Sequence, residues 1–195
     1  MDARRRRSQE SLFRAVLARA SALPLIEVTV TDVAADAGVN RSTFYQHAAT
    51  VPQLLRDALR SQLDEARAEH LQGLTPEEVP AALEGVTRSV LRHIDANALI
   101  YQRAFDGAPG EPAAGDAAGL AVMLTDHFAT SAAEVLAHGG VATPGGPDTA
   151  GAAARYIAAG TVGAIQAWLR TPGERDVDAF AEVITLLHPA WWTGR

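Results

Sequence analysis

The sequence contains no cysteine, which excludes a disulfide framework, a thiolate metal site and a cysteine nucleophile. It contains no run of about 18 or more apolar residues, so no transmembrane helix is predicted. Four arginines, Arg4 to Arg7, lie near the N-terminus, but no compact apolar stretch with a cleavage site follows them. We therefore expect no secretory signal and a cytoplasmic location for the chain.

Lysine is also absent, and arginine supplies all 17 positive charges. The formal net charge is −6, which by itself is unusual for a protein that binds nucleic acid. The charges are unevenly distributed, however: residues 1–50 contain seven arginines and five acidic residues, whereas residues 51–195 contain ten arginines and eighteen acidic residues. A basic head on an acidic body is typical of local contact with nucleic acid, because the body repels DNA and the head binds it.

Apolar residues make up 48% of the sequence and recur at helical spacing, whereas no segment shows a convincing alternation of apolar and polar residues. The predicted fold is therefore all-α, with about nine helices. We expect two domains: residues 1–50 form a helix-turn-helix head with a basic N-terminal arm, and residues 51–195 form a larger helical domain. Caps, prolines and glycines place the helices at residues 9–23, 30–37, 41–47, 52–71, 76–94, 98–105, 117–138, 149–170 and 177–188.

Residues 29–47 read TVTDVAADAGVNRSTFYQH and predict two short helices joined by a tight turn. Thr29 begins a capping box with Asp32, Gly38 ends the first helix, and Asn40 caps the second. A turn of this kind sets the two helices at a steep angle. The apolar side chains spaced to pack between them and against Phe13 are Val33, Ala34, Val39 and Phe44.

The same segment closely resembles the DNA-binding motif of the TetR family of repressors. In that family a Thr opens the motif, an Asp follows three residues later, and an Ala-Gly-Val turn leads into Thr-Phe-Tyr-x-His. The resemblance implies an N-terminal DNA-binding domain and a C-terminal domain that forms a homodimer and binds a small molecule. The matching residues are Thr29, Asp32, Ala37, Gly38, Val39, Thr43, Phe44, Tyr45 and His47.

The resemblance also implies roles for the polar side chains of the motif. Thr31, Arg41 and Ser42 would face bases, and Arg41 and Ser42 lie at the end of the second helix that enters the major groove. The side chains that would mainly hold phosphates are Thr43, Tyr45 and His47, and Thr29 and Gln46 complete the predicted DNA-binding set.

One part of the motif departs from the family. Ala48 and Val51 stand where an aromatic residue and a phosphate-binding lysine are usual, so one phosphate contact is expected to be missing. The N–H groups at the start of the next helix offer a substitute. Arg4 to Arg7 are either a flexible arm along the DNA or a solvated run of charge without a defined role, and the sequence leaves both interpretations open.

In the C-terminal domain the last two long helices are expected to form the dimer, as a four-helix interface with two-fold symmetry. Small residues on the first of them would let another helix approach closely. The alternative is that this apolar stripe belongs only to an internal core. The stripe consists of Ile157, Gly160, Thr161, Ala164 and Trp168 on one helix and Val177, Phe180, Val183, Ile184 and Leu187 on the other.

The ligand is expected to be small and largely apolar or aromatic, because pockets in helical bundles are mostly apolar with a few polar groups. For each candidate residue, ordinary core or surface packing is the more common explanation. No cofactor or metal is predicted, and the tail tryptophans, Trp191 and Trp192, either cover the final helices or are exposed. The candidate ligand-binding residues are Leu63, Arg67, Val90, His93, Tyr101, Phe105, Met123, His127 and Trp168.

The predicted function is therefore a DNA-binding repressor that a ligand releases from a palindromic operator. An activator, or a regulator without a ligand, would have the same fold and is not excluded by the sequence. An all-helical enzyme is less favoured, because no nucleophile–base pair, paired carboxylates or phosphate-cradling glycine loop is present.

Overall fold

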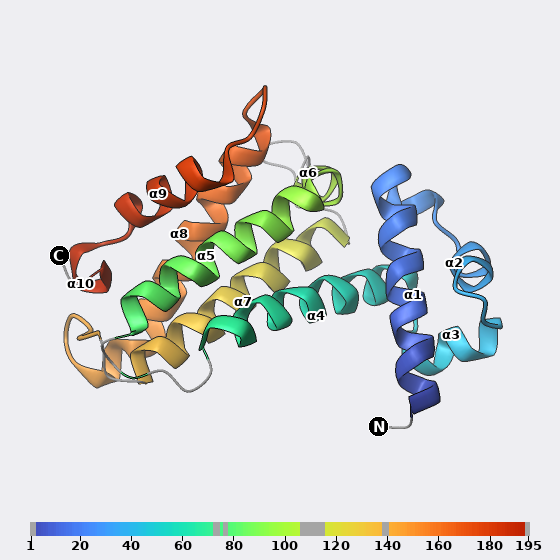
Figure 1. Ribbon diagram of the computed structural model, residues 1–195, viewed down its shortest axis with the longest axis horizontal. Helices are drawn as coiled ribbons and strands as arrows, with labels where there is room; N and C mark the ends of the chain where they lie inside the picture. Colours follow the sequence, from blue (N-terminus) through green and yellow to red (C-terminus); the bar gives the residue numbers. More distant parts are fainter. Residues whose placement is uncertain (1–2, 72–74, 76–77, 106–115, 138–140, 194–195) are drawn as a thin grey trace. The chain divides into compact units, whose positions relative to one another are not determined.

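A computed structural model describes residues 3–71, 75, 78–105, 116–137 and 141–193 (Figure 1). Every regular element among these residues is helical, which confirms the predicted all-α fold. The α-helices are α1 (Ala3–Ala22), α2 (Val30–Asp36), α3 (Arg41–His47), α4 (Val51–Leu71), α5 (Val79–Ala96), α6 (Ala98–Phe105), α7 (Asp116–Ala137), α8 (Ala150–Arg170), α9 (Val177–Leu187) and α10 (Ala190–Thr193), with short 3-10 helices η1 (Leu25–Glu27) and η2 (Pro147–Thr149).

The chain divides into two compact units, Met1–Gln62 and Leu63–Arg195, and the division falls inside α4. The expected functional division between residues 50 and 51 stays a prediction. None of the described helices combines the length and the apolar character that crossing a bilayer would require.

The N-terminal unit is built on α1, which contacts both α2 and α3. Leu12 and Val16 on α1, Val33 on α2 and Phe44 on α3 are completely buried. Phe13, which was expected to pack in this core, is only half-buried. Leu12 and Val16 take its place because they are four residues apart and therefore lie on the same face of the helix.

The two short helices begin and end as the capping residues predicted. The hydroxyl oxygen of Thr29 accepts the N–H of Asp32 at 3.2 Å, and the hydroxyl group donates to the Asp32 carboxylate at 2.6 Å. The side-chain oxygen of Asn40 accepts the N–H of Thr43 at 2.8 Å. Between the helices, Gly38 has a φ of 67°, a conformation that residues with a Cβ rarely adopt.

The start of α1 differs from the prediction, because the helix begins at Ala3 and not after Ser8. The Ser8 hydroxyl donates to the carbonyl of Arg5 at 2.9 Å, a bond typical of a serine inside a helix. Arginine is a good helix former, and Arg6 forms an i,i+4 ion pair with Glu10 at 3.6 Å. Arg4 to Arg7 are therefore helical, which neither interpretation of this segment anticipated, and their contact with DNA stays a prediction.

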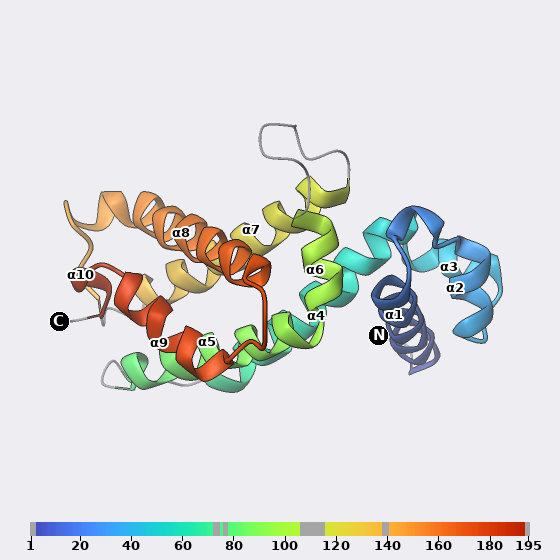
Figure 2. The same ribbon diagram turned by 90° about the horizontal axis from the view of Figure 1, so that it is seen from above.

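In the C-terminal unit, α7 and α8 lie side by side, and α9 lies against α5 (Figures 1 and 2). Polar side chains join several of these helices. Arg155 on α8 binds Asp126 on α7 at 2.7 Å, and Gln102 on α6 donates to the carbonyl of Leu169 on α8, also at 2.7 Å. These bonds set the register of the helices, which apolar packing alone leaves less well defined.

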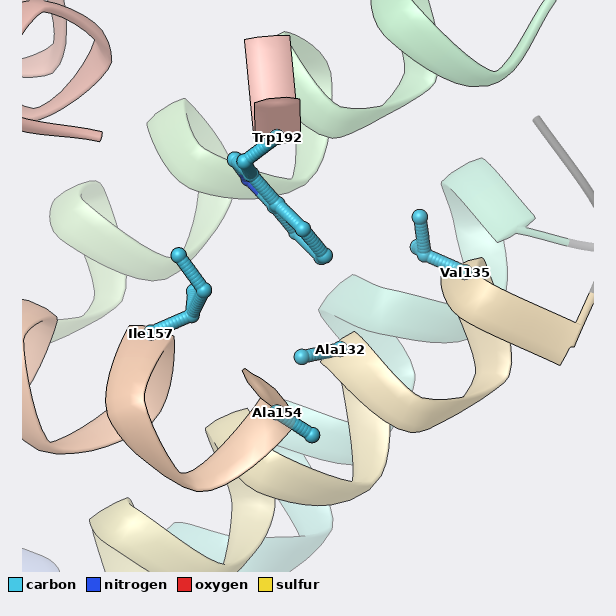
Figure 3. Packing of buried hydrophobic residues seen from close by; sticks show 5 residues of the cluster. All are labelled: Ala132, Val135, Ala154, Ile157 and Trp192. Atoms are coloured by element: carbon cyan, nitrogen blue, oxygen red, sulfur yellow. The ribbon is translucent and has the colours of Figure 1, made fainter. Parts of the chain in front are cut away.

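The C-terminal tail returns to this bundle through α10. Trp192 is 6% exposed and packs against Ala132 and Val135 on α7 and Ala154 and Ile157 on α8 (Figure 3). Of the two interpretations of the tail tryptophans, coverage of the bundle is therefore the correct one for Trp192.

Candidate functional site

The recognition helix expected from the sequence, α3, has two different faces. Phe44 is completely buried, whereas Arg41, Ser42 and Gln46 are exposed and Tyr45 is 52% exposed. The remaining members of the predicted DNA-binding set are the exposed Thr29 and Thr31 and the half-buried Thr43 and His47. A buried anchor opposite a polar face is the arrangement that a helix needs to enter the major groove.

The polar side chains at the start of α3 share one acceptor. The side-chain oxygen of Asn40 accepts from the Ser42 hydroxyl at 2.6 Å and from the Thr43 hydroxyl at 2.9 Å, in addition to the Thr43 N–H. The hydroxyl protons of both residues thus point toward the cap. The lone pairs of Ser42 remain available to accept from an amino group on a base edge.

His47, at the other end of α3, contacts α1. Its Nε2 lies 2.9 Å from the Ser8 hydroxyl oxygen, and Ser8 also donates to the Arg5 carbonyl. Both contacts are hydrogen bonds only if Nε2 carries the proton and donates to Ser8. Burial, together with the nearby charge of Arg5, lowers the pKa of His47.

A second link between α1 and the motif is an ion pair that sequence reasoning missed. The Arg19 guanidinium donates two hydrogen bonds to the Asp36 carboxylate, at 2.6 and 2.9 Å. The hydrogen bond from Arg19 lowers the pKa of Asp36. The two residues are 17 positions apart, so no local pattern indicated the pair.

The two positions that depart from the family motif are buried. Ala48 is 3% and Val51 is 5% exposed, and both contribute to the core at the start of α4. The N–H of Gln53 donates to the Thr50 hydroxyl at 3.2 Å, and the N–H of Ala49 donates to the Gln53 side chain at 3.1 Å. Side chains thus satisfy two donors at this helix start, and fewer remain for a phosphate than the sequence suggested.

Most candidate ligand-binding residues lie in the core of the C-terminal unit. His93 is half-buried, and the Arg67 side chain is 22% exposed. The buried ones are Leu63, Val90, Tyr101, Phe105, Met123, His127 and Trp168.

The structure brings several of these candidates together. His93 Nε2 lies 3.0 Å from the hydroxyl of Tyr101, and the Tyr101 ring stacks on Phe105. His127 Nδ1 lies 3.3 Å from the Asp64 carboxylate, and Arg67 bridges to Glu134 at 3.4 Å. Burial, with the nearby charge of His127, lowers the pKa of His93 to about 4. A polar group of a ligand would find hydrogen-bonding partners here.

Trp168 does not belong to that group, because it faces α9. Its ring stacks on Phe180 with the centroids 4.6 Å apart, and the Arg175 guanidinium lies 5.9 Å from its centroid. Arg175 also pairs with Asp95 on α5 at 2.6 Å. Trp168 therefore helps to fix α9 within the same chain, which supports a structural role.

Some residues of the predicted dimer stripe are buried within the chain, and others are exposed. Ile157, Thr161 and Ile184 are buried, as is Trp168, whereas Gly160, Val183 and Leu187 are exposed. Tyr156 and Leu186, which sequence reasoning missed, are 68% and 72% exposed. A cavity of about 390 Å³ opens between α8 and α9, and its lining residues are Tyr156, Ile157, Ala159, Gly160, Thr161, Ala164, Ile184, Leu187, His188 and Pro189.

No family model matches the chain, and no curated protein sequence matches it. Solved structures do. A dihydroxyacetone kinase operon activator, DhaS, is 15% identical, with a TM-score of 0.65 over 92% of this chain and 93% of that one. A TetR-family regulator from Streptomyces coelicolor is 16% identical, with a TM-score of 0.61 over 91% of this chain and 77% of that one. Thermus thermophilus FadR, a TetR-family repressor solved with lauroyl-CoA, is 20% identical, with a TM-score of 0.60 over 92% of both chains. The fold of this chain is thus the TetR fold that the motif indicated.

The lowered pKa of His93 predicts that stability depends on pH. The unfolded chain binds a proton at His93 near pH 6.5, whereas the folded chain does so only near pH 4. Unfolding is therefore favoured as the pH falls from about 6.5 to about 4, and His93 contributes a loss of roughly 2 kcal/mol by pH 5. His93→Gln can still donate to Tyr101 but cannot be protonated. Urea denaturation at pH 7 and pH 5 should show a smaller loss in this variant, and equal losses would contradict the assignment.

Proposed function

We infer that the chain is a member of the TetR family: a transcriptional regulator that binds a palindromic DNA site as a homodimer and releases it when a small ligand binds. One observation carries the proposal. Within a TetR fold, α3 buries Phe44 and exposes Arg41, Ser42 and Tyr45, side chains that can bind bases and phosphates. Because a transcriptional regulator acts on the genome, we expect this protein to act in the cytoplasm.

The two ends of α3 have different tasks in this proposal. Arg41 and Ser42 lie in the first turn, which enters the major groove, and a guanidinium can bind guanine through two hydrogen bonds. Tyr45 and His47 lie further along the helix and hold phosphates, with Thr43 beside the cap. Thr31 on α2 is exposed and is the second candidate for a base contact.

The DNA-binding proposal is tested by alanine substitutions in the first and last turns of α3. Arg41→Ala should weaken operator binding by about 1–3 kcal/mol and relax sequence preference at one base pair of each half-site. Tyr45→Ala should weaken binding to all sequences about equally, because phosphates carry no sequence information. Fluorescence anisotropy on a site selected from genomic fragments measures both effects. Arg14→Ala removes an exposed arginine elsewhere on α1 and serves as the control. Unchanged affinity in the Arg41→Ala, Tyr45→Ala double variant would overturn the proposal.

The homodimer is proposed to form through the outer face of α8 and α9. Exposed small residues on α8, among them Ala159, Gly160 and Gly163, permit a close approach of a second helix. Around them, Tyr156, Leu186 and Leu187 expose large apolar surfaces that a monomer would leave in water. A two-fold axis through this face would also match the symmetry of a palindromic site, with the two α3 helices ~34–36 Å apart.

The dimer interface is tested with a charge on an exposed position of α8. Ala159→Arg should give a folded monomer, because dimerisation would bury an arginine without a partner. Analytical ultracentrifugation measures the mass, and circular dichroism checks the fold. Val122→Arg places the same charge on an exposed apolar position of α7 and should remain dimeric. A dimeric Ala159→Arg protein would place the interface elsewhere.

The ligand is proposed to be small and largely apolar or aromatic, with a polar group directed toward His93 and Tyr101. The apolar candidates around them support the first part, and the hydrogen-bonded pair supports the second. A neighbour with the same fold was solved with lauroyl-CoA, which makes long-chain acyl thioesters sensible first probes. The helix α4 extends from one unit into the other, so it can transmit a change. The ligand shifts the balance only if it binds the state that fits DNA less well more tightly.

Regulation by a ligand predicts reciprocal coupling. If a ligand lowers DNA affinity, operator DNA must lower ligand affinity by the same factor, on the order of 5–150-fold. Compounds are first selected by thermal shift, beginning with lauroyl-CoA, and each is then titrated calorimetrically with and without a saturating operator fragment. Equal affinity in both titrations would reject the mechanism for that compound.

A role as activator remains the second candidate, and a specific observation favours keeping it. The neighbour with a TM-score of 0.65 is described as an operon activator, so the same fold serves both outcomes. Transcription from the target promoter with and without the protein distinguishes the two. The solved neighbours named above are regulators, which also supports a non-enzymatic role for this chain.

A further inference from the structure

We propose that the basic first turn of α1 is a second DNA-binding surface, in which Arg4 and Arg5 bind the phosphate backbone beside the segment read by α3. This inference rests on the proposed DNA-binding function and adds a contact outside the helix-turn-helix. Its starting observation is that Arg4 to Arg7 are part of a helix and are all exposed.

The position of Ser8 defines which arginines face α3. Ser8 contacts His47 at 2.9 Å, so the side of α1 that carries Ser8 faces the C-terminal end of α3. Residues three and four positions apart are neighbours on one face of a helix. Arg5 and Arg4 stand three and four positions before Ser8 and therefore lie on this face, one turn further toward the N-terminus.

Arg6 lies on the other side of the same turn. It stands two positions before Ser8, which places it about 160° away around the helix axis. Its guanidinium pairs with Glu10 at 3.6 Å, and this carboxylate partly neutralises its charge. Of the four arginines in this turn, Arg4 and Arg5 thus lie toward α3, Arg6 lies on the opposite side, and Arg7 lies about 100° from Ser8.

The electrostatics of His47 agree with this placement. After burial, the charge of Arg5 is the second cause that lowers the pKa of His47, as expected for an arginine near the end of α3. In the proposed function His47 holds a phosphate. A phosphate there would also meet the charge of Arg5, and the next phosphate along the strand would be within reach of Arg4.

A phosphate contact from Arg4 and Arg5 would replace the one that is expected to be missing at Val51. Val51 stands where a phosphate-binding lysine is usual in the family that the motif resembles, and it is 5% exposed. Two arginines on a rigid helix supply positive charge near the DNA at a lower entropic cost than a flexible arm, because the helix has already ordered their backbone.

The salt dependence of DNA binding tests this surface. Each phosphate contact releases counterions and contributes about 0.9 to the slope of log affinity against log salt concentration. The full-length Arg4→Ala, Arg5→Ala variant should bind more weakly to every sequence and should lose about 1.8 of that slope for each subunit, if each arginine holds one phosphate. The ratio of operator to nonspecific affinity should not change, because phosphates carry no sequence information.

Two variants serve as matched controls. Arg6→Ala removes one charge, half of what the double variant removes, from the opposite side of the turn and should keep the slope of the unmodified protein. Arg4→Lys with Arg5→Lys keeps the charge and should also keep the slope. Circular dichroism spectra and melting temperatures verify that all variants fold alike.

The outcomes separate this inference from the proposed function. If the unmodified protein binds no DNA, both are overturned. If it binds DNA and the Arg4→Ala, Arg5→Ala variant keeps the full salt slope, only the second surface is wrong. If Arg6→Ala lowers the slope by half as much as the double variant does, or by more, the effect is one of net charge, and the assignment of a specific face is overturned.

Discussion

The burial of Phe44 is the interaction on which the proposed DNA-binding surface depends. A helix of seven residues is too short to be stable in water by itself, so α3 persists only because it packs against α1 and α2. Removing one large aromatic side chain from water contributes roughly 1.5–3 kcal/mol, and Phe44 is completely buried. The exposed side chains of α3 hold their positions because this anchor, together with the contact between His47 and Ser8, fixes the helix against its neighbours.

The C-terminal unit is organised around α8, which takes part in two different kinds of packing. Its inner face, with Ile157, Thr161 and Trp168, joins the core, and Trp168 connects it to α9. Its outer face carries alanine and glycine, whose small size would let a second helix approach closely. The same helix therefore connects the interior, which would hold a ligand, to the surface proposed for dimerisation.

Local signals in the sequence predicted the N-terminal unit well, whereas long-range contacts were not predictable. The caps at Thr29 and Asn40 and the turn at Gly38 each depend on residues no more than three positions apart, and the structure confirms them. The contact between Ser8 and His47 joins residues 39 positions apart, and the pair of Arg175 with Asp95 spans 80. In α8 the apolar pattern covers most of the surface, so it did not indicate which face is buried. No comparable signal places a ligand among His93, Tyr101 and His127.

The shared acceptor at Asn40 has a consequence for how such a protein could change its DNA target. An amide oxygen has two lone pairs, but three donors from Ser42 and Thr43 lie within 3 Å of it. The atom that stabilises α3 therefore also orients the side chains that would read DNA. A mutation at either residue therefore alters recognition and helix stability together. Because both residues share this partner, the effects of mutating Ser42 and Thr43 will not be additive. New binding specificities are thus more accessible through Arg41 or Gln46, which are not bonded to this cap, than through its immediate neighbours.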